Sequence, residues 1–208
     1  MEYKVCGITD LMQAVVLDEM KVNYIGFIFY KPSKRYVLNK LNLSELSAFR
    51  PANAKKVGVF VNESLEQVIE VIRKATLDIV QLHGDEDPSY CATINQIVPV
   101  IKVFRVGKSV PDFALFENAA SYYLFDTDSA LYGGTGQHFN WELIKNTEFN
   151  KPYFLSGGIG PNDLHGIEVL QKTKAGKSLS VIDVNSQFET APGIKNLELI
   201  KTFIYASI

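Results

Sequence analysis

Two side chains in this sequence have the chemistry of an acid and a base, and each stands at the end of a short apolar run. Cys6 ends the run Tyr3–Cys6, and a thiol becomes a competent base where a positive charge or a helix N-terminus favours the thiolate. Asp126 follows the aromatic run Tyr122–Phe125, and a carboxyl between apolar walls can keep its proton and serve as a general acid. The alternatives are that Cys6 only packs and that Asp126 caps a turn, a task that Asp128 could take instead. If Asp126 is not the acid, Asp128 is the next candidate. Together the two side chains predict a pair of proton transfers.

Three further polar side chains stand near the ends of apolar runs, where they could hold a substrate. Arg35 lies in the loop Lys31–Tyr36, where it is either a solvated charge or a planar, two-pronged partner for a carboxylate. His83 directly follows one run and is a candidate hydrogen-bonding residue, and Asp183 lies near the end of another. The chain has 3 histidines and no close cluster of histidine with carboxylate, so no metal site is expected.

Two loops rich in backbone donors predict a phosphate site. The first contains Gly157 and Gly158, and the second contains Ser186 and Gln187. They follow the last two apolar runs of the chain. In barrels built from alternating strands and helices, these two loops commonly bind phosphate through backbone N–H groups. A phosphorylated substrate is therefore expected.

The strands and helices that are expected to position these residues alternate at a regular spacing. Eight β-rich apolar runs are each followed by a segment with helical signals, at spacings of roughly 20 to 30 residues, about the length of one strand and one helix. Several runs are apolar without alternation, as a parallel sheet covered on both faces requires. The expected strands are Tyr3–Cys6, Tyr24–Phe29, Lys56–Val61, Asp78–Leu82, Pro99–Phe104, Tyr122–Asp126, Pro152–Ser156 and Leu179–Val184.

Several of the intervening helices carry start signals, and two units are expected to be short. Asp10 and Ser64 are each followed three residues later by glutamine, which matches the capping-box arrangement. Asp87–Pro88 matches an N-cap followed by proline at the first helical position. After the fifth strand, glycine and proline leave little room for a helix. Before the eighth strand, Lys174–Lys177 has the composition of a turn, so the helix there is expected to be equally short.

Eight such units favour a closed (β/α)8 TIM barrel, an α/β fold with eight parallel strands. The competing arrangement is an open doubly wound sheet, which shares the same rhythm. Gly158–Gly160 and Gly134–Gly136 each lack the third glycine of the dinucleotide fingerprint, and neither belongs to the first unit. Gly133–Gly136 is instead expected to form a mobile loop at the rim. In a barrel the carboxyl ends of the strands carry the active site, which is where the candidate residues stand.

The bulk composition excludes several classes of protein. With 208 residues, of which 47% are hydrophobic and 21% charged, the chain fits one catalytic domain over residues 1–208. A formal net charge of −2, without long runs of one sign, gives no general attraction for nucleic acid or an anionic membrane. The N-terminus has no apolar stretch as long as that of a signal peptide, and no later apolar stretch is long enough to span a membrane. The 2 cysteines lie too far apart for a CxxC motif, so a cytoplasmic location is expected.

Several motifs around these positions occur together over nearly the full length of the chain. The most specific are Lys4–Thr9 around the cysteine, and Asp126 with Gly133–Gly136. The others are Gly26–Phe29, Pro32–Tyr36, Val57–Asn62, Val80–Gly84, Phe139–Trp141, Leu155–Ile159, Asp183–Ser186, Glu189 and Pro192–Lys195. Together they resemble the phosphoribosylanthranilate isomerase family of tryptophan biosynthesis. The phosphate loops are shared with other barrels and discriminate little.

The resemblance implies an Amadori rearrangement of N-(5-phosphoribosyl)anthranilate to 1-(2-carboxyphenylamino)-1-deoxyribulose 5-phosphate, without metal or organic cofactor. Asp126 would protonate the furanose ring oxygen as the ring opens to an iminium. Cys6 would take the proton from C2 of the sugar, giving an enolamine that tautomerises to the ketone. An acid and a base on opposite sides of the barrel mouth suit these two transfers. Arg35 would hold the anthranilate carboxylate, and Asp183 would contact sugar hydroxyls or orient the substrate.

The resemblance also assigns the phosphate site and exposes two departures. Backbone N–H groups of Gly157, Gly158, Ser186 and Gln187 would hold the phosphate. The family usually has glycine at the position of Gln187, and a glutamine in the left-handed conformation would cost about 1–2 kcal/mol. Ordinary dihedrals would instead re-aim its N–H group, and of the two we expect the strained form. Asn196 replaces the aspartate that the family tends to have near the start of the last helix, where only a cap is expected to change.

Three other functions share parts of this pattern. The analogous isomerase of histidine biosynthesis uses aspartates as both acid and base, which disagrees with a cysteine at the end of the first strand. A metal-dependent ribulose-phosphate epimerase needs histidine and carboxylate ligands that the sequence lacks. A non-catalytic phosphate-binding barrel is disfavoured by Cys6 and Asp126 and favoured only by Gln187. The expected partner is a small phosphoribosyl substrate, and no obligate protein partner is indicated.

Overall fold

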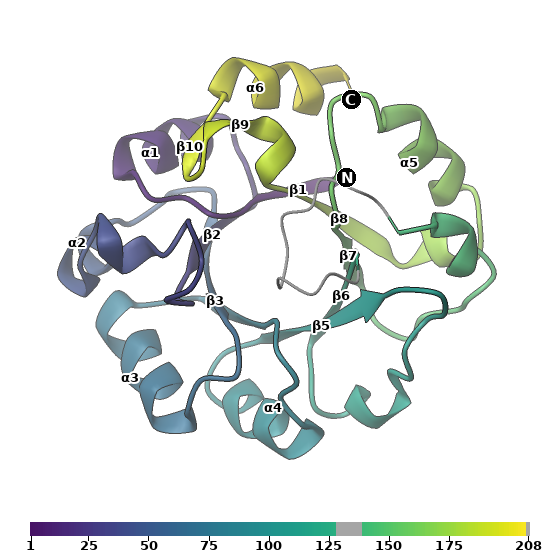
Figure 1. Ribbon diagram of the computed structural model, residues 1–208, viewed down its shortest axis with the longest axis horizontal. Helices are drawn as coiled ribbons and strands as arrows, with labels where there is room; N and C mark the ends of the chain where they lie inside the picture. The colour runs from purple at the N-terminus through teal and green to yellow at the C-terminus, as the bar shows by residue number, and fades with distance from the viewer. Residues whose placement is uncertain (128–138, 207–208) are drawn as a thin grey trace.

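The strands of this chain close into a ring. The computed structural model describes residues 1–127 and 139–206. Within them, eight parallel strands follow one another around a closed barrel, and β8 pairs with β1 through partners such as Asp183 and Lys4. Figure 1 looks along the barrel and shows the strands as an inner ring with the helices outside it. The predicted (β/α)8 barrel is confirmed, and the open doubly wound sheet is excluded.

Every barrel strand begins and ends within two residues of its predicted run. The strands are β1 (Glu2–Val5), β2 (Tyr24–Ile28), β3 (Lys55–Phe60), β4 (Ile79–Leu82), β5 (Val100–Val106), β6 (Tyr122–Thr127), β7 (Tyr153–Leu155) and β8 (Leu179–Val184). An antiparallel pair, β9 (Glu189–Ala191) and β10 (Ile194–Lys195), follows β8 and was not predicted. It carries Glu189 to the edge of the barrel where the strands end.

The helices of the described residues differ in length around the ring. The α-helices are α1 (Leu11–Glu19), α2 (Leu43–Ala48), α3 (Leu65–Ala75), α4 (Pro88–Asn95), α5 (Leu164–Gln171) and α6 (Leu197–Ala206). Shorter 3₁₀ turns are η1 (Val37–Asn39), η2 (Ala114–Phe116), η3 (Trp141–Leu143), η4 (Ala175–Lys177) and η5 (Ser186–Phe188). None of the helices described in residues 1–127 and 139–206 is long and apolar enough to cross a membrane.

The predicted short unit after the fifth strand is confirmed, because only η2 connects β5 to β6. Aromatic rings cover the sheet there instead, with Phe113 packed against Phe104, Tyr123, Phe125 and Phe149. The prediction of an equally short helix before the eighth strand is wrong. An eight-residue helix, α5, precedes β8, and the turn-like segment forms η4 after that helix has ended.

The predicted helix starts are found, but the two capping boxes are not. Asp10 accepts from the N–H of Met12, while the Gln13 side chain exchanges hydrogen bonds of 3.1 and 3.0 Å with the backbone of Lys195. Gln13 therefore ties α1 to β10 instead of closing a box. The Ser64 hydroxyl accepts from the N–H of Gln67 at 3.3 Å, but the Gln67 amide donates to Glu70.

Two other helix starts behave as the residue types predict. Asp87 accepts from the N–H of Tyr90 at 2.9 Å, with Pro88 as the first residue of α4. Asn196 accepts from the N–H of Leu199 at 3.1 Å at the start of α6. An asparagine thus caps the last helix as an aspartate would, so the departure at Asn196 leaves the cap in place.

The barrel interior explains where the polar residues lie. Its apolar layer consists of Tyr24, Val57, Ile79, Ile101, Val103, Leu124, Phe154 and Val181. Alternate side chains of a strand point to the same face, so a step of two residues leads from this layer to the next inward position. That step leads from Ile79 to Gln81, from Leu124 to Asp126 and from Val181 to Asp183. On β1 the same step leads from Lys4 to Cys6. Inward polar groups therefore collect above the apolar layer.

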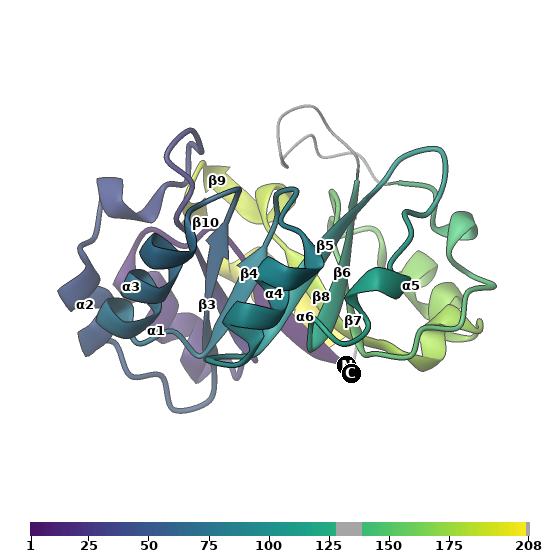
Figure 2. The ribbon, with the colours of Figure 1, turned by 90° about the horizontal axis from the view of Figure 1, so that it is seen from below.

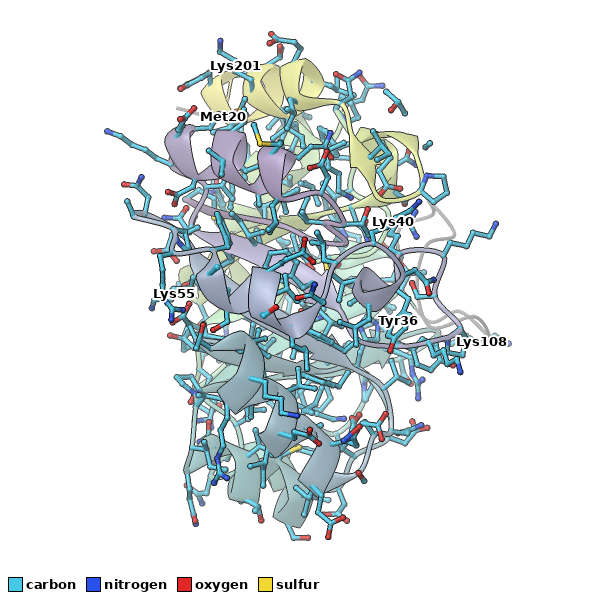
Figure 3. All side chains as sticks on the ribbon, turned by 90° about the vertical axis from the view of Figure 1, so that its left-hand side faces the viewer. Met20, Tyr36, Lys40, Lys55, Lys108 and Lys201 are labelled. Atoms are coloured by element: carbon cyan, nitrogen blue, oxygen red, sulfur yellow. The ribbon has the colours of Figure 1, made fainter. Side chains whose placement is uncertain are left out.

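The carboxyl ends of the strands gather at one edge of the barrel. Figure 2 shows β9 and β10 at this edge and both chain termini at the opposite one. In Figure 3, Tyr36 and Lys108, which follow β2 and β5, lie on one side of the molecule, and Lys55, the first residue of β3, lies on the other. All the loops that were predicted to carry chemistry therefore open at one edge.

Candidate active site

The carboxyl edge of the barrel holds a cavity of about 500 Å³. Every predicted site residue except Gln187 lines it, namely Cys6, Arg35, His83, Asp126, Gly157, Gly158, Asp183 and Ser186. A more open hollow of about 860 Å³ outside α2 has no carboxylate, histidine or cysteine in its lining. The cavity at the strand ends is therefore the candidate active site.

Cys6 is held at the end of the first strand by backbone pairing and by a glycine on the neighbouring strand. Its N–H donates to the Val184 carbonyl at 2.9 Å, which continues the ladder between β1 and β8. The thiol lies against Gly26 of β2, where an added Cβ would come within 2.9 Å of the Cys6 sulfur. Only glycine leaves room there, so the sequence of β2 makes the space that the thiol occupies.

A buried lysine lies next to the thiol. The Lys4 ammonium is fully buried, 2.9 Å from Asp183 Oδ2, and forms a hydrogen bond with Cys6. Burial alone lowers the pKa of Lys4, but the charge of Asp183 and the contact with Cys6 outweigh it and raise that pKa above its ordinary value. Lys4 is therefore a fixed positive charge beside the Cys6 thiol.

The thiol itself is in a low-dielectric place. Burial raises the pKa of Cys6, while the positive charges of Lys4 and Lys195 oppose this effect. The net direction is upward, so the protonated thiol is favoured in the ligand-free protein. A positive charge that develops on a ligand beside Cys6 would act in the same direction as Lys4 and favour the thiolate.

Asp126 is the inward-facing carboxyl of β6, and donors approach both of its oxygens. The N–H of Thr127 donates to Oδ1 at 2.7 Å, and His83 Nε2 lies 3.2 Å from Oδ2. The other ring nitrogen of His83 lies 3.1 Å from the amide nitrogen of Gln81. The acid candidate is therefore the end of a hydrogen-bonded row that runs from β4 to β6.

Arg35 is a structured cation. Its Nε lies 2.9 and 3.0 Å from the two carboxylate oxygens of Glu189, and its Nη2 lies 2.6 Å from Oε2. Glu189 also accepts from Lys195 Nζ at 2.7 Å and from the N–H of Gly193 at 3.0 Å. Burial raises the pKa of Glu189, but the two cations outweigh this and lower it, so the carboxylate stays ionised. Nη1 of Arg35 takes no part in this pair.

We expect Glu189→Gln to raise the KM for substrate about fivefold to tenfold with little change in kcat. The amide keeps the size of the side chain but loses the charge and one acceptor that hold the guanidinium. Arg35 would then be ordered only when a ligand carboxylate contacts it, and the cost of ordering the guanidinium would weaken binding of that ligand. Steady-state kinetics measure the change, with the exposed Glu66→Gln as the control. A lower KM would mean instead that Glu189 competes with the substrate for Arg35.

The loop after β7 is shaped by glycine and lies beside the acid candidate. Gly157 and Gly158 have φ values of +90° and +72°, in the left-handed region that glycine adopts readily. A Cβ on Gly157 would lie 2.7 Å from the backbone nitrogen of Thr127 and 3.0 Å from Asp126 Oδ1. The close approach places this loop directly against the end of β6. Ser186, at the start of η5, lines the same cavity.

The expected strain at Gln187 is wrong. Positive φ values occur at Lys21, Asn62 and Thr76 among the described residues other than glycine, and Gln187 is not one of them. It lies in η5 with an exposed side chain, and a Cβ on Gly160 would contact that side chain at 3.6 Å. The loop after β8 closes as a 3₁₀ turn, which any residue type can adopt, so no glycine is required.

Gln187→Gly is therefore expected to leave the KM for substrate within about twofold of the parent. It should also lower the free energy of unfolding by roughly 0.5–1 kcal/mol, because glycine gains backbone freedom in the unfolded chain. Steady-state kinetics and denaturant unfolding check the two effects. A clear drop in KM would show that the glutamine does hinder the ligand.

Two predictions lie outside the described residues. These are the rim loop Gly133–Gly136 and Asp128, the alternative acid.

Three residues of the site were not predicted as site residues: Lys4, Gln81 and Glu189. Lys4 and Gln81 lie two residues before Cys6 and His83, so the period of two of a strand could have predicted that they face inward as well. No comparable pattern links Glu189 to Arg35, which lies 154 positions away.

Comparisons with known proteins give matches that extend over nearly the whole chain. Residues 3–206 match the family model described as N-(5'phosphoribosyl)anthranilate (PRA) isomerase. The chain is 35% identical over 205 residues to the N-(5'-phosphoribosyl)anthranilate isomerase of Parabacteroides distasonis, covering 97% of this chain and 90% of that protein. It is similar to the crystal structure of phosphoribosyl anthranilate isomerase from Thermotoga maritima, with a TM-score of 0.80, 34% identity, and coverage of 100% and 98%.

A further solved structure holds a ligand. It is a phosphoribosyl anthranilate isomerase in complex with reduced 1-(o-carboxyphenylamino)-1-deoxyribulose 5-phosphate. The TM-score is 0.74 at 31% identity, and the match covers 100% of this chain and 98% of that one. As its name states, the ligand of that protein carries a carboxyphenylamino group, a deoxyribulose chain and a 5-phosphate.

Proposed function

Because the chain belongs to the N-(5'-phosphoribosyl)anthranilate isomerase family, we propose that Cys6 is the base and Asp126 the acid of its rearrangement. The activity is the isomerisation of N-(5'-phosphoribosyl)anthranilate in tryptophan biosynthesis. One observation carries the assignment of roles: the thiol after β1 and the carboxyl on β6 line one cavity. The single feature that had favoured a non-catalytic barrel was Gln187, and its backbone lacks the positive φ that would have strained the loop.

The first step is the opening of the sugar ring. Asp126 gives its proton to the ring oxygen, the bond between C1 and that oxygen breaks, and the nitrogen lone pair forms a C1 iminium. The N–H of Thr127, 2.7 Å from Oδ1, stabilises the carboxylate that Asp126 becomes. This hydrogen bond becomes stronger as negative charge develops on Asp126, so it lowers the activation barrier of ring opening more than it stabilises the bound substrate.

The second step is removal of the proton from C2. The iminium makes this hydrogen acidic and brings a positive charge beside Cys6. That charge, with Lys4, favours the thiolate that accepts the proton. The C–H electron pair forms the C1–C2 double bond of the enolamine, and the iminium nitrogen becomes a neutral amine. Tautomerisation of the enol to the ketone then completes the isomerisation.

The remaining residues bind and orient the substrate in this proposal. Arg35, held by Glu189, contacts the anthranilate carboxylate. The loops with Gly157, Gly158 and Ser186 bind the phosphate through N–H groups, to which Gln187 contributes only its backbone. Asp183 and His83 face the sugar. The Oδ1 oxygen of Asp183 is buried and has no hydrogen-bond partner among the described residues, as expected of an acceptor for a hydroxyl.

We also propose that residues 1–208 form one catalytic domain that acts in the cytoplasm on a small phosphoribosyl substrate, without an obligate protein partner. Both cysteines are free and buried. A base that must remain a thiol requires a reducing compartment, which supports the location.

The function is tested by direct turnover. Incubation of the protein with phosphoribosylanthranilate labelled with ¹³C at C2 should convert an alcohol carbon resonance into a ketone carbon resonance. The double variant Cys6→Ser, Asp126→Asn serves as the control, because it retains the cavity but lacks both proton-transfer groups. Binding of the substrate without formation of the ketone would favour the non-catalytic barrel.

A further inference from the structure

Gln81 lies at the start of the hydrogen-bonded row that ends at Asp126. Its side chain is buried, points inward from β4 and lines the cavity. Its amide nitrogen lies 3.1 Å from Nδ1 of His83, and Nε2 of the same ring lies 3.2 Å from Asp126 Oδ2. Gln81 lies in β4, and His83 directly follows this strand with its N–H donating to the Phe60 carbonyl at 2.9 Å, as the next step of the ladder to β3. The two residues are two positions apart on this extended backbone, so their side chains lie along the same face.

This geometry determines which nitrogen of His83 carries the proton. A neutral imidazole has one N–H donor and one acceptor nitrogen, and the hydrogen bond at one nitrogen sets the state of the other. An amide N–H directed at Nδ1 makes that nitrogen the acceptor. The proton then sits on Nε2, where it is donated toward Asp126 Oδ2. The contact on one side of the ring therefore controls the contact on the other.

The amide oxygen of Gln81, Oε1, helps to keep the NH₂ group directed at His83. Oε1 is buried and has no hydrogen-bond partner in residues 1–127 and 139–206. Since Gln81 lines the cavity, a hydroxyl group of a bound sugar can donate to this oxygen. A donor at Oε1 leaves the NH₂ group toward His83, so ligand binding and the tautomer of His83 favour each other.

We infer that Gln81 is a positioning residue that fixes His83 as the Nε2–H tautomer, which donates to the carboxylate formed when Asp126 gives up its proton. In ring opening, the proton leaves Asp126 for the ring oxygen and the electron pair of the broken bond stays on that oxygen. The carboxylate then accepts from Thr127 at Oδ1 and from His83 at Oδ2. The other tautomer would direct a lone pair at Oδ2 and oppose the transfer. The inference rests on the proposed role of Asp126 as the acid.

The kinetic test uses Gln81→Met, which keeps the length of the side chain and removes both amide groups. We expect kcat to fall about tenfold, because the donor at Oδ2 is no longer fixed, and KM to rise severalfold, because the hydroxyl loses its acceptor. The exposed Gln171→Met is the matched control. Thermal unfolding of each variant shows whether the barrel is intact.

A double-mutant cycle separates positioning of His83 from simple contact with the substrate. In His83→Gln the new amide can donate to Asp126 without a tautomer to be set, so adding Gln81→Met should change kcat by less than about twofold. An equal loss of kcat in both backgrounds would overturn the inference, because Gln81 would then act independently of His83.

The tautomer can also be observed without turnover. The chain has 3 histidines, and ¹⁵N NMR of the ring nitrogens distinguishes a protonated from an unprotonated nitrogen. The His83 signals are assigned by their loss in His83→Gln. We expect a protonated Nε2 in the parent and a mixture of tautomers in Gln81→Met. A protonated Nδ1 in the parent would overturn the inference. This readout stands whether or not Asp126 proves to be the acid, so the two failures are distinguishable.

Discussion

Cys6→Ser is expected to lower kcat by at least about 100-fold while the barrel stays folded, because a positioned base contributes that much to a proton transfer. The serine hydroxyl has nearly the size of the thiol, so it fits beside Gly26 and can keep the hydrogen bond with Lys4. It does not ionise in the range where the enzyme works. The defect should therefore lie in removal of the C2 proton and not in binding.

Calorimetry with a reduced product analogue and single-turnover kinetics separate these two effects. The dissociation constant should change little, while the single-turnover rate falls as kcat does. Cys91→Ser is the control, since Cys91 is also buried and free but lies in α4, outside the cavity. Near-normal turnover of Cys6→Ser would remove Cys6 from the mechanism.

The pH dependence of kcat/KM gives the same assignment a second test. Burial raises the pKa of Cys6, so the fraction of thiolate in the free enzyme increases only as the pH rises toward that elevated value. A reaction that needs the thiolate must therefore become faster as the pH rises. We expect an ascending limb of kcat/KM on the alkaline side, and its loss in Cys6→Ser. A parent profile without such a limb would mean that the thiolate is not the reacting form.

The barrel was predictable because its strands are defined by local composition. Apolar, β-branched and aromatic runs between polar loops give the position of each strand to within two residues, and pairing in sequence order follows from the repeated unit. The helical units were harder. After β5 the sheet is covered by aromatic packing around Phe113 instead of a helix, and the length of α5 depends on tertiary contacts that a turn-like segment downstream does not reveal.

The site was predictable where a polar residue ends an apolar run and less so where it lies inside one. Cys6, His83 and Asp126 stand out because they end apolar runs. Lys4 lies within its strand and was passed over, although the period of two directs it inward with Cys6. Burying a polar residue at an inward position near the end of a barrel strand costs free energy, so its presence there points to a functional site.

Gln187 shows a different limit of sequence comparison. The resemblance implied a glycine at that position and so predicted a left-handed backbone, yet the chain here forms a 3₁₀ turn without positive φ and accepts a side chain. Glycine at one position can reflect a required conformation, a close approach, or neither. Without the φ angle these reasons cannot be separated, which is why the expected strain was wrong while the neighbouring glycines, Gly157 and Gly158, do have positive φ.

Asp126→Asn is expected to lower kcat by about 100-fold or more, because the amide cannot deliver a proton to the ring oxygen. The substitution is nearly isosteric, so the hydrogen bond from the N–H of Thr127 and the packing against Gly157 can be retained. Asp112→Asn is the matched control. It makes the same chemical change on an exposed aspartate that also accepts from a backbone N–H, at 2.9 Å, but lies outside the cavity.

The loss in Asp126→Asn should differ in kind from the loss in Cys6→Ser. Asp126 acts before any iminium exists, so its removal should block ring opening, and exchange of the C2 hydrogen with solvent should cease. Removal of Cys6 leaves ring opening possible, so a trapping reagent such as borohydride should still reduce the iminium in that variant and not in Asp126→Asn. If Asp126→Asn keeps its rate, another group supplies the proton, and Asp128 becomes the next candidate. If both variants instead allow trapping equally, the order of the two proton transfers proposed here is wrong.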